Sequence, residues 1–90
     1  MKDKELFRAG VIYFNLKNYL EAVKYLSPLV KKEHSYAQYY LGQIYEYGGH
    51  GIKQSISRAK KLYISSAINN CERAIKAMIR IGNKELSLKK

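Results

Sequence analysis

The sequence predicts an all-α fold, a short α-solenoid of about five antiparallel helices in which two helical hairpins are followed by a C-terminal capping helix. Apolar residues recur at three- and four-residue steps through most of the 90 residues, which is typical of helices with one buried face. Helix breakers are few: the only proline is Pro28, and glycines cluster at Gly48, Gly49 and Gly51. Similar segments also return at a nearly constant spacing, which is typical of repeat architectures.

The first two helices are expected at residues 3–15 and 19–32. Asn18 precedes the second helix and carries the type of side chain that accepts a hydrogen bond from a free backbone N–H, with Glu21 at the third helical position. Pro28 lies inside this helix, where it removes a backbone hydrogen bond. We therefore expect a bend or break at Pro28, or a separate final turn.

The next two helices are expected at residues 35–47 and 55–69. Ser35 and Ser55 precede the apolar patterns and are suited to cap the N-termini of these helices. The glycine cluster ends the third helix. Because short connections join consecutive helices, the helices should pack antiparallel, as hairpins stacked side by side.

A fifth helix is expected at residues 71–82. Asn70 can adopt the left-handed conformation that separates it from the fourth helix. The segment 83–90 has weak periodicity and should fray. The predicted organisation is a single domain, 1–90, made of a unit at about 3–34, a unit at about 35–70 and a capping helix at about 71–82.

Two sets of residues match between the units. Residues of the first helix recur 32 positions later, and residues of the second helix recur 37 positions later. The first set pairs Ala9, Gly10 and Tyr13 with Leu41, Gly42 and Tyr45; the second pairs Ala22, Tyr25 and Leu26 with Ala59, Leu62 and Tyr63. The small residues allow helix backbones to approach, and the large residues fill the gaps between hairpins.

From residue 37 onward the sequence resembles the SEL-like repeat, a close relative of the tetratricopeptide repeat. The family pattern is Ala, three spacers, Leu-Gly, two spacers, Tyr, a glycine turn, then Lys-Ala, an aromatic pair and Ala-Ala. The matching residues here are Ala37, Leu41, Gly42, Tyr45, Gly48, Gly51, Arg58, Ala59, Leu62, Tyr63, Ser66 and Ala67. The chain departs from the pattern in one extra residue in the glycine turn, in Ser55 for aspartate and in Leu62 for tryptophan.

Residues 6–36 resemble a tetratricopeptide-type unit without the glycine turn, and residues 71–82 resemble the first helix of a third unit. In that third unit Ile79 stands where the family has a small glycine, which should obstruct a following helix and favours a capping role. The resemblance implies a stack of hairpins that binds proteins or peptides on a broad concave face, without catalysis.

The resemblance also implies that the first helix of each unit lines this concave face. The residues that it places there are Phe7, Val11, Phe14 and Asn15 in the first unit, Tyr36, Tyr39, Gln43, Glu46 and Tyr47 in the second, and Arg73, Lys76 and Arg80 in the third. Exposed aromatic residues beside arginine are typical of interaction hot spots. The alternative is that these aromatic residues belong to the core of a short stack.

The chain is strongly basic, with 17 Lys and Arg against 7 Asp and Glu and a formal net charge of +10. Such a charge attracts anionic partners. The leading hypothesis is a non-enzymatic protein–protein interaction module that grips an acidic segment or surface, as an adaptor or as a toxin-neutralising (immunity) protein. The alternative is a basic nucleic-acid-binding accessory protein that uses residues such as Lys31, Arg58 and Lys60. A solvated helix face explains the same basic residues without any ligand.

Nothing in the sequence indicates a catalytic residue, a metal site or a cofactor site. The single cysteine, Cys71, excludes an intramolecular disulfide and a multi-cysteine metal site. His34 and His50 lack the neighbours of a metal site, and the glycine cluster lacks the Walker spacing. No apolar run reaches the length of a signal peptide or a membrane span. We therefore expect a cytoplasmic protein, and self-association through the ends of the stack stays open.

Overall fold

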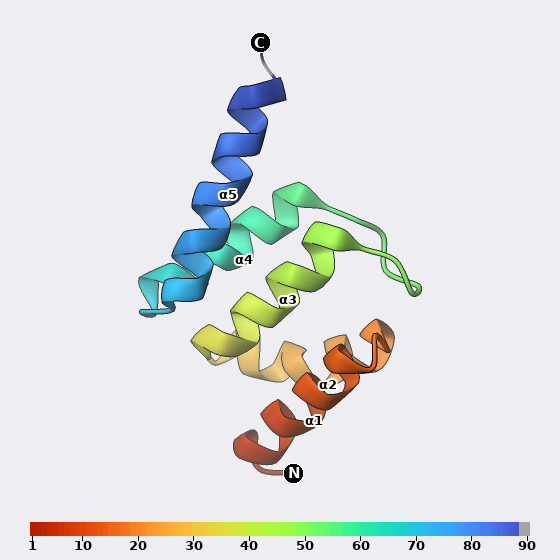
Figure 1. Cartoon of the computed structure of the whole chain (residues 1–90). Helices are drawn as coiled ribbons and strands as arrows, with labels where there is room; N and C mark the ends of the chain where they lie inside the picture. Colours follow the sequence, from red (N-terminus) through yellow and green to blue (C-terminus); the bar gives the residue numbers. More distant parts are fainter. Residues whose placement is uncertain (89–90) are drawn as a thin grey trace.

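Five helices follow one another in the computed structural model, which describes residues 1–88. They are α1 (Asp3–Asn15), α2 (Tyr19–Lys31), α3 (Ser35–Tyr47), α4 (Ile56–Ile68) and α5 (Glu72–Leu88) (Figure 1). The described residues are 78% helical and contain no β-strand. Helices α1 and α2 form one hairpin, α3 and α4 form the next, and α5 packs on α4. The predicted all-α solenoid of five antiparallel helices is confirmed.

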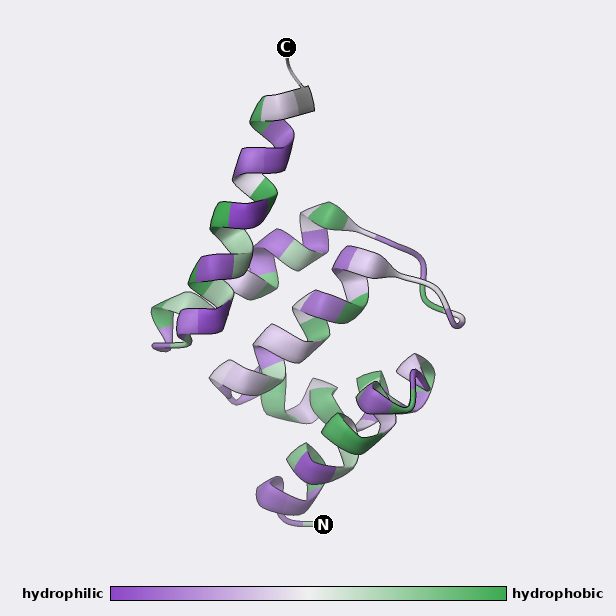
Figure 2. Cartoon of the chain, in the orientation of Figure 1, coloured by the Kyte–Doolittle hydropathy of each residue, from purple (hydrophilic) through white to green (hydrophobic). Residues whose placement is uncertain are grey.

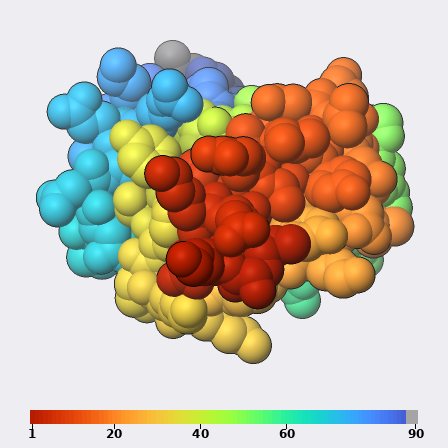
Figure 3. All heavy atoms as spheres, turned by 90° about the horizontal axis from the view of Figure 1, so that it is seen from below, coloured from red at the N-terminus to blue at the C-terminus, as the bar shows by residue number. Residues whose placement is uncertain are grey.

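The stack is elongated, with extents of 48 × 28 × 17 Å. Helix α1 covers one end of it, as the view from below shows (Figure 3). The last turns of α5 project past the other helices at the opposite end (Figure 1). None of the helices in residues 1–88 is long and apolar enough to cross a membrane.

Local chemistry explains most of the helix ends. Ser55 caps α4 as expected, because its Oγ accepts a hydrogen bond from the backbone N–H of Arg58 at 3.2 Å. The cap of α3 is His34 and not Ser35: His34 Nδ1 accepts from the N–H of Ala37 at 3.2 Å. Asn18 holds the N-cap position of α2 but forms no side-chain capping bond.

The turns between helices use left-handed backbone at Lys17, Glu33 and Asn70, with φ of 62°, 62° and 70°. Only Asn70 was expected there, because Asn tolerates this conformation better than Lys or Glu. The longer loop after α3 folds back on α2: the Tyr19 and His50 rings meet edge to face at 5.3 Å.

Helix α2 runs unbroken through Pro28 to Lys31. The expectation of a break or a separate final turn at Pro28 is therefore wrong. Leu26 and Leu29, on either side of the proline, are both fully buried. Burial of two leucines contributes about 1.5 to 3 kcal/mol each, which outweighs the roughly 3 kcal/mol that proline costs inside a helix.

Helix α5 continues to Leu88, so the expected fraying from residue 83 is wrong over residues 83–88. The segment 89–90 lies outside the described residues. Two contacts hold the longer helix to α4: Ile81 is buried between α4 and α5, and Glu85, one turn later, forms an ion pair with Lys60. The weak apolar periodicity of this segment did not reveal the ion pair.

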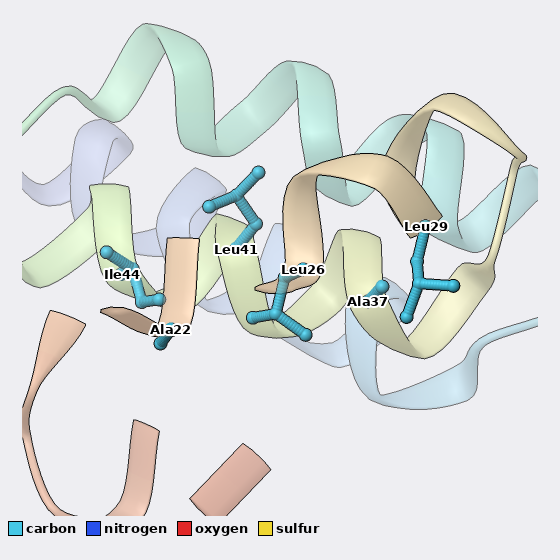
Figure 4. Packing of buried hydrophobic residues seen from close by; sticks show 6 residues of the cluster. All are labelled: Ala22, Leu26, Leu29, Ala37, Leu41 and Ile44. Atoms are coloured by element: carbon cyan, nitrogen blue, oxygen red, sulfur yellow. The ribbon is translucent and has the colours of Figure 1, made fainter. Parts of the chain in front are cut away.

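The core consists of two clusters. The first lies between α2 and α3 and comprises Ala22, Leu26, Leu29, Ala37, Leu41 and Ile44 (Figure 4). The second lies between α4 and α5 and comprises Ala59, Tyr63, Cys71, Ala74, Ala77 and Ile81. Both clusters join helices from successive units, so the core holds the stack together as well as each hairpin.

Glycines mark the closest helix contacts within each hairpin. A Cβ atom at Gly10 would lie 2.5 Å from Leu26 Cδ2, and one at Gly42 would lie 2.7 Å from Tyr63 Cε1. Any larger residue would force the helices apart. The matching of Gly10 with Gly42 in the sequence therefore reflects the same close approach in both units.

Candidate functional site

A groove lies between α3 and α5, and side chains from both helices line it. The lining residues are Tyr39, Gln43 and Tyr47 from α3 and Arg73, Lys76, Ala77 and Arg80 from α5. Its volume is about 330 Å³. The groove thus brings together six of the twelve residues that the sequence predicted for partner binding, and all six come from the second and third units.

Helical spacing explains why these residues share the groove. Tyr39, Gln43 and Tyr47 follow one another at four-residue steps, so they form one stripe on α3. Gln43 Nε2 donates a hydrogen bond to the Tyr39 hydroxyl at 2.5 Å and fixes the two side chains together. Burial raises the pKa of Tyr39, which therefore stays a neutral phenol.

Beneath the groove, Glu46 of α3 forms a buried network with Tyr63 of α4 and Arg80 of α5. Its Oε1 accepts hydrogen bonds from the Tyr63 hydroxyl at 2.7 Å and from Arg80 Nη2 at 2.9 Å, and its Oε2 accepts from Arg80 Nη1. A buried carboxylate needs such partners, because burying an ion without them costs on the order of several kcal/mol. The network joins three helices at one carboxylate.

The network shifts the ionisation of all three side chains. Burial alone would raise the pKa of Glu46, but the hydrogen bonds from Arg80 and Tyr63 outweigh it and hold the pKa below its ordinary value. Burial, with the hydrogen bond to Glu46, raises the pKa of Tyr63. The hydrogen bonds to Glu46 raise the pKa of Arg80. The ion pair and the neutral phenol are therefore the stable forms.

Glu46 was predicted as a partner-binding residue, and the structure places it in the floor instead, with its side chain only 7% exposed. Arg80 belongs both to this network and to the groove. It is bound to Glu46, yet its side chain is 45% exposed and its guanidinium lies 5.8 Å from the Tyr47 ring centroid. Arg73 and Lys76 form no ion pair within residues 1–88, so they carry the unbalanced positive charge of the groove.

The predicted residues of the first unit lie elsewhere. Phe7 stacks on His34 at 4.8 Å and Phe14 meets the Tyr40 ring edge to face at 5.0 Å, both against the first core cluster. Val11 lines a separate hollow on α1. For Phe7 and Phe14 the structure agrees with the alternative that they belong to the core.

The two remaining predicted residues, Asn15 and Tyr36, are exposed on α1 and α3. Neither lines the α3–α5 groove. The structure therefore separates the predicted set into six residues that share one groove, three that pack inward (Phe7, Phe14 and Glu46), Val11 in its separate hollow and these two surface residues.

Sequence reasoning missed the role of Tyr63 and the binding of Glu46 by Arg80. A signal was present: Glu46 is the only acidic residue between Glu33 and Glu72. A tyrosine at a core position of the repeat needs a partner for its hydroxyl, and a single nearby carboxylate is the natural acceptor.

Basic residues on the second helices are partly engaged within the chain. Lys32 forms an ion pair with Asp3 at 2.9 Å, and Lys60 pairs with Glu85. The Arg58 guanidinium lies 5.4 Å from the Tyr45 ring centroid. These contacts agree with a solvated helix face better than with a continuous phosphate-binding surface.

No cluster of three or more potential metal ligands was found among residues 1–88. Cys71 is a free thiol buried in the second core cluster. The groove itself holds no nucleophile beside a base. What the arrangement offers is binding: three cations, of which Arg80 is held by Glu46, and three aromatic or amide side chains on one open surface.

Two stretches of the chain, residues 6–31 and 35–71, match the model of the Sel1 repeat. These stretches coincide with the hairpins α1–α2 and α3–α4, and the second extends to the turn before α5. No curated protein matches the chain, and no solved structure does.

Proposed function

Because the chain belongs to the Sel1 repeat family, whose repeats are generally modules of protein–protein interaction, we propose that it binds an acidic segment of a partner protein in the α3–α5 groove. The Sel1 repeat is a non-catalytic interaction module. The protein therefore acts by holding its partner. The observation that carries the proposal is the meeting of Arg73, Lys76 and two tyrosines in one groove.

Charge supports an acidic ligand. The unpaired cations Arg73 and Lys76 stand one helical turn apart on α5 and face the tyrosines of α3. The net charge of +10 adds a long-range attraction for anionic partners. Carboxylates of a bound segment would receive hydrogen bonds from these cations while the rest of the segment lies along the groove.

Aromatic residues supply the contact area. Tyr47 is largely exposed and Tyr39 is half-buried, so together they offer one open and one recessed apolar surface. Tyrosine and arginine are enriched at the centres of interfaces because they combine contact area with directed hydrogen bonds. The Glu46 network fixes Arg80 against Tyr47 before a partner arrives, which lowers the entropy that binding costs.

In a more specific form of this proposal, the partner is a toxin whose active site the module occludes, as an immunity protein. We also propose a reducing compartment such as the cytoplasm, because a chain with one cysteine, Cys71, does not use disulfides within itself for stability. The second candidate function is nucleic-acid binding, which the excess of 17 basic over 7 acidic residues favours.

The experiment first captures the partner from the native source with tagged protein, identifies it by mass spectrometry and measures its affinity by calorimetry. Tyr39→Ala and Tyr47→Ala should each weaken binding about tenfold or more, because they remove interface anchors. Helicity, followed by circular dichroism, should stay unchanged.

A matched pair of charge reversals separates groove binding from attraction by net charge alone. The Arg73→Glu/Lys76→Glu variant and the Lys31→Glu/Lys61→Glu variant change the net charge equally, but only the first alters the groove. We expect a large loss of affinity from the first and little from the second. Equal losses, together with tight binding of generic RNA that weakens steeply with salt, would favour the nucleic-acid function instead.

A further inference from the structure

An exposed apolar surface covers the C-terminal end of the stack. It is formed by Ile64 and Ile68 of α4 and by Ile75, Ile79 and Leu86 of α5, which we call the end face. Ile79 is 58% exposed and Leu86 is 65% exposed. Hydrophobic positions recur along α5 between hydrophilic ones, up to the part that projects beyond the other helices (Figure 2). Monomeric proteins rarely expose large apolar patches.

The end face occupies the position where the next helix of the stack would lie. Helix α2 packs on α1 and α3, and α4 packs on α3 and α5, but within residues 1–88 no helix covers the groove between α4 and α5. That groove has a volume of about 330 Å³, and its apolar lining residues are Ile64, Met78, Ile81, Gly82 and Leu86. The paired Lys60 and Glu85 complete the lining. The apolar part fits a helix that runs antiparallel to α5, as the second helix of each hairpin does.

Gly82 offers the point of closest approach on α5. A Cβ atom there would meet nothing within 4 Å, so the backbone is open to a neighbour. The sequence suggested that Ile79, in place of a small residue, obstructs a following helix. Because the small residue stands one turn later, at Gly82, a helix can still approach there, with Ile79 and Leu86 on either side.

We propose that a second copy of this chain covers the end face, with the two α5 helices antiparallel and crossing near Gly82. A two-fold axis at that point sets Ile79 of one copy opposite Leu86 of the other, and the same contact then occurs twice. The end face thereby continues the stacking interface of the chain itself. This proposal does not depend on the groove between α3 and α5.

The available area agrees with a weak dimer. Helix α5 has 17 residues and is therefore about 25 Å long, but α4 lies beside only its first part, because the last turns of α5 project past the other helices. Each copy would contribute at most about 500 Å², so the total buried area does not exceed the roughly 1,000 Å² of the smallest specific interfaces. The two copies should therefore exchange between monomer and dimer.

The positive charge of the chain opposes this dimer, so the dependence of dimerisation on salt can identify it. Arg73, Lys76, Arg80 and Lys84 follow one another on the face of α5 that is turned toward α3, so the dimer leaves them in water. Two copies of charge +10 still repel each other at long range. Salt screens that repulsion, so the dimer should strengthen as salt rises, whereas binding of an acidic partner should weaken.

The first test is sedimentation equilibrium over about a hundredfold range of protein concentration, at about 0.05 M and about 0.5 M NaCl. We expect a monomer–dimer equilibrium with more dimer at the higher salt. Ile79→Lys should abolish the dimer, with Leu86→Lys as a second variant at the same contact. Ile12→Lys on α1 is the matched control, because Ile12 is 51% exposed and the change in charge is identical. A monomer under all conditions, or equal loss from Ile12→Lys, would overturn the proposal and leave the end face to a different partner.

The second test measures the direction of pairing by oxidation of single introduced cysteines, since the native Cys71 is buried. Gly82→Cys should form a disulfide-linked dimer readily, because the two positions meet at the crossing. Ile75→Cys should not, because antiparallel helices would hold the two positions about 20 Å apart, far beyond the roughly 5.5 Å between Cα atoms in a disulfide. Equal cross-linking at both positions indicates parallel helices and contradicts the proposal.

Discussion

At the scale of single residues, Glu46 connects stability with the candidate site. Its carboxylate accepts hydrogen bonds from Tyr63 in the core and from Arg80 in the groove. Both donors would lose their partner if the carboxylate were removed. We therefore propose that Glu46 acts on binding through Arg80, without contacting the partner itself.

The contribution of Glu46 to stability should depend on pH. Because its folded-state pKa lies below the ordinary value of 4.5, the folded state binds a proton less readily than the unfolded chain does. This stabilisation is complete above the ordinary value and is lost as the pH falls through the lower, folded-state value. We expect Glu46→Gln to lower the free energy of unfolding at neutral pH, and the difference in free energy of unfolding between the two proteins to narrow as the pH falls below the ordinary value and through the lower, folded-state value.

Urea titrations at a series of pH values measure the difference in free energy of unfolding between the native protein and Glu46→Gln. Glu5→Gln is the control, because Glu5 is exposed and forms no ion pair among the described residues. If the difference in free energy of unfolding between the native protein and Glu46→Gln stays constant over the whole acid range, the ionised carboxylate is not the stabilising form.

At the scale of elements, the helices are specified by their contacts as well as by their own sequences. Pro28 does not break α2 because buried leucines on both sides hold the helix in the core. The last turns of α5 follow directly on Ile81, which is buried against α4, and Glu85 adds an ion pair with Lys60 of α4. In both places a contact between helices outweighs the local preference of the chain.

Two glycines in helices offer a direct test of close packing. Gly42→Ala places a methyl group 2.7 Å from the Tyr63 ring and should destabilise the protein by about 1 to 3 kcal/mol, as overpacking does. Gly82→Ala makes the same substitution where nothing lies within 4 Å, and should stabilise α5 by up to about 1 kcal/mol.

Urea midpoints measured at low protein concentration, where the monomer dominates, compare the two glycine variants. Opposite signs of the change in stability are expected. If both variants shift the midpoint in the same direction, the close contact between α3 and α4 at Gly42 does not determine the effect.

At the scale of the whole molecule, charge is unbalanced. The chain carries 17 basic and 7 acidic residues, and the ion pairs found in residues 1–88 use only three of the acidic ones, Asp3, Glu46 and Glu85. The surplus of positive charge is therefore spread over the surface, where it repels itself and opposes the compact state.

Salt should consequently stabilise the folded monomer. We expect the thermal midpoint to rise between about 0.02 M and about 0.3 M NaCl, because the Debye length shortens over this range. Lys24→Glu, an exposed change on α2, should raise the midpoint at low salt and reduce its dependence on salt. A midpoint that falls with added salt would mean that the ion pairs outweigh the general repulsion.

The sequence by itself determined the helices, their order and the repeat. Apolar periodicity located all five helices, and the left-handed turn at Asn70 and the cap at Ser55 followed from residue type. These features depend on neighbours within about one helical turn, so local sequence specifies them. The matched glycines identified the close contacts for a different reason: both units repeat one packing arrangement, so the same small residue recurs where two helices approach.

Only the tertiary structure decided which of the predicted binding residues meet. It brought Tyr39 and Tyr47 beside Arg73 and Lys76, turned Phe7 and Phe14 toward the core, and placed Glu46 in the floor of the groove. Neither the burial of a side chain nor its partner on another helix follows from periodicity, which gives only the face of one helix. Those properties depend on how α3, α4 and α5 pack together, and residues that fix this packing, such as Glu46 and Arg80, lie 34 positions apart in the chain.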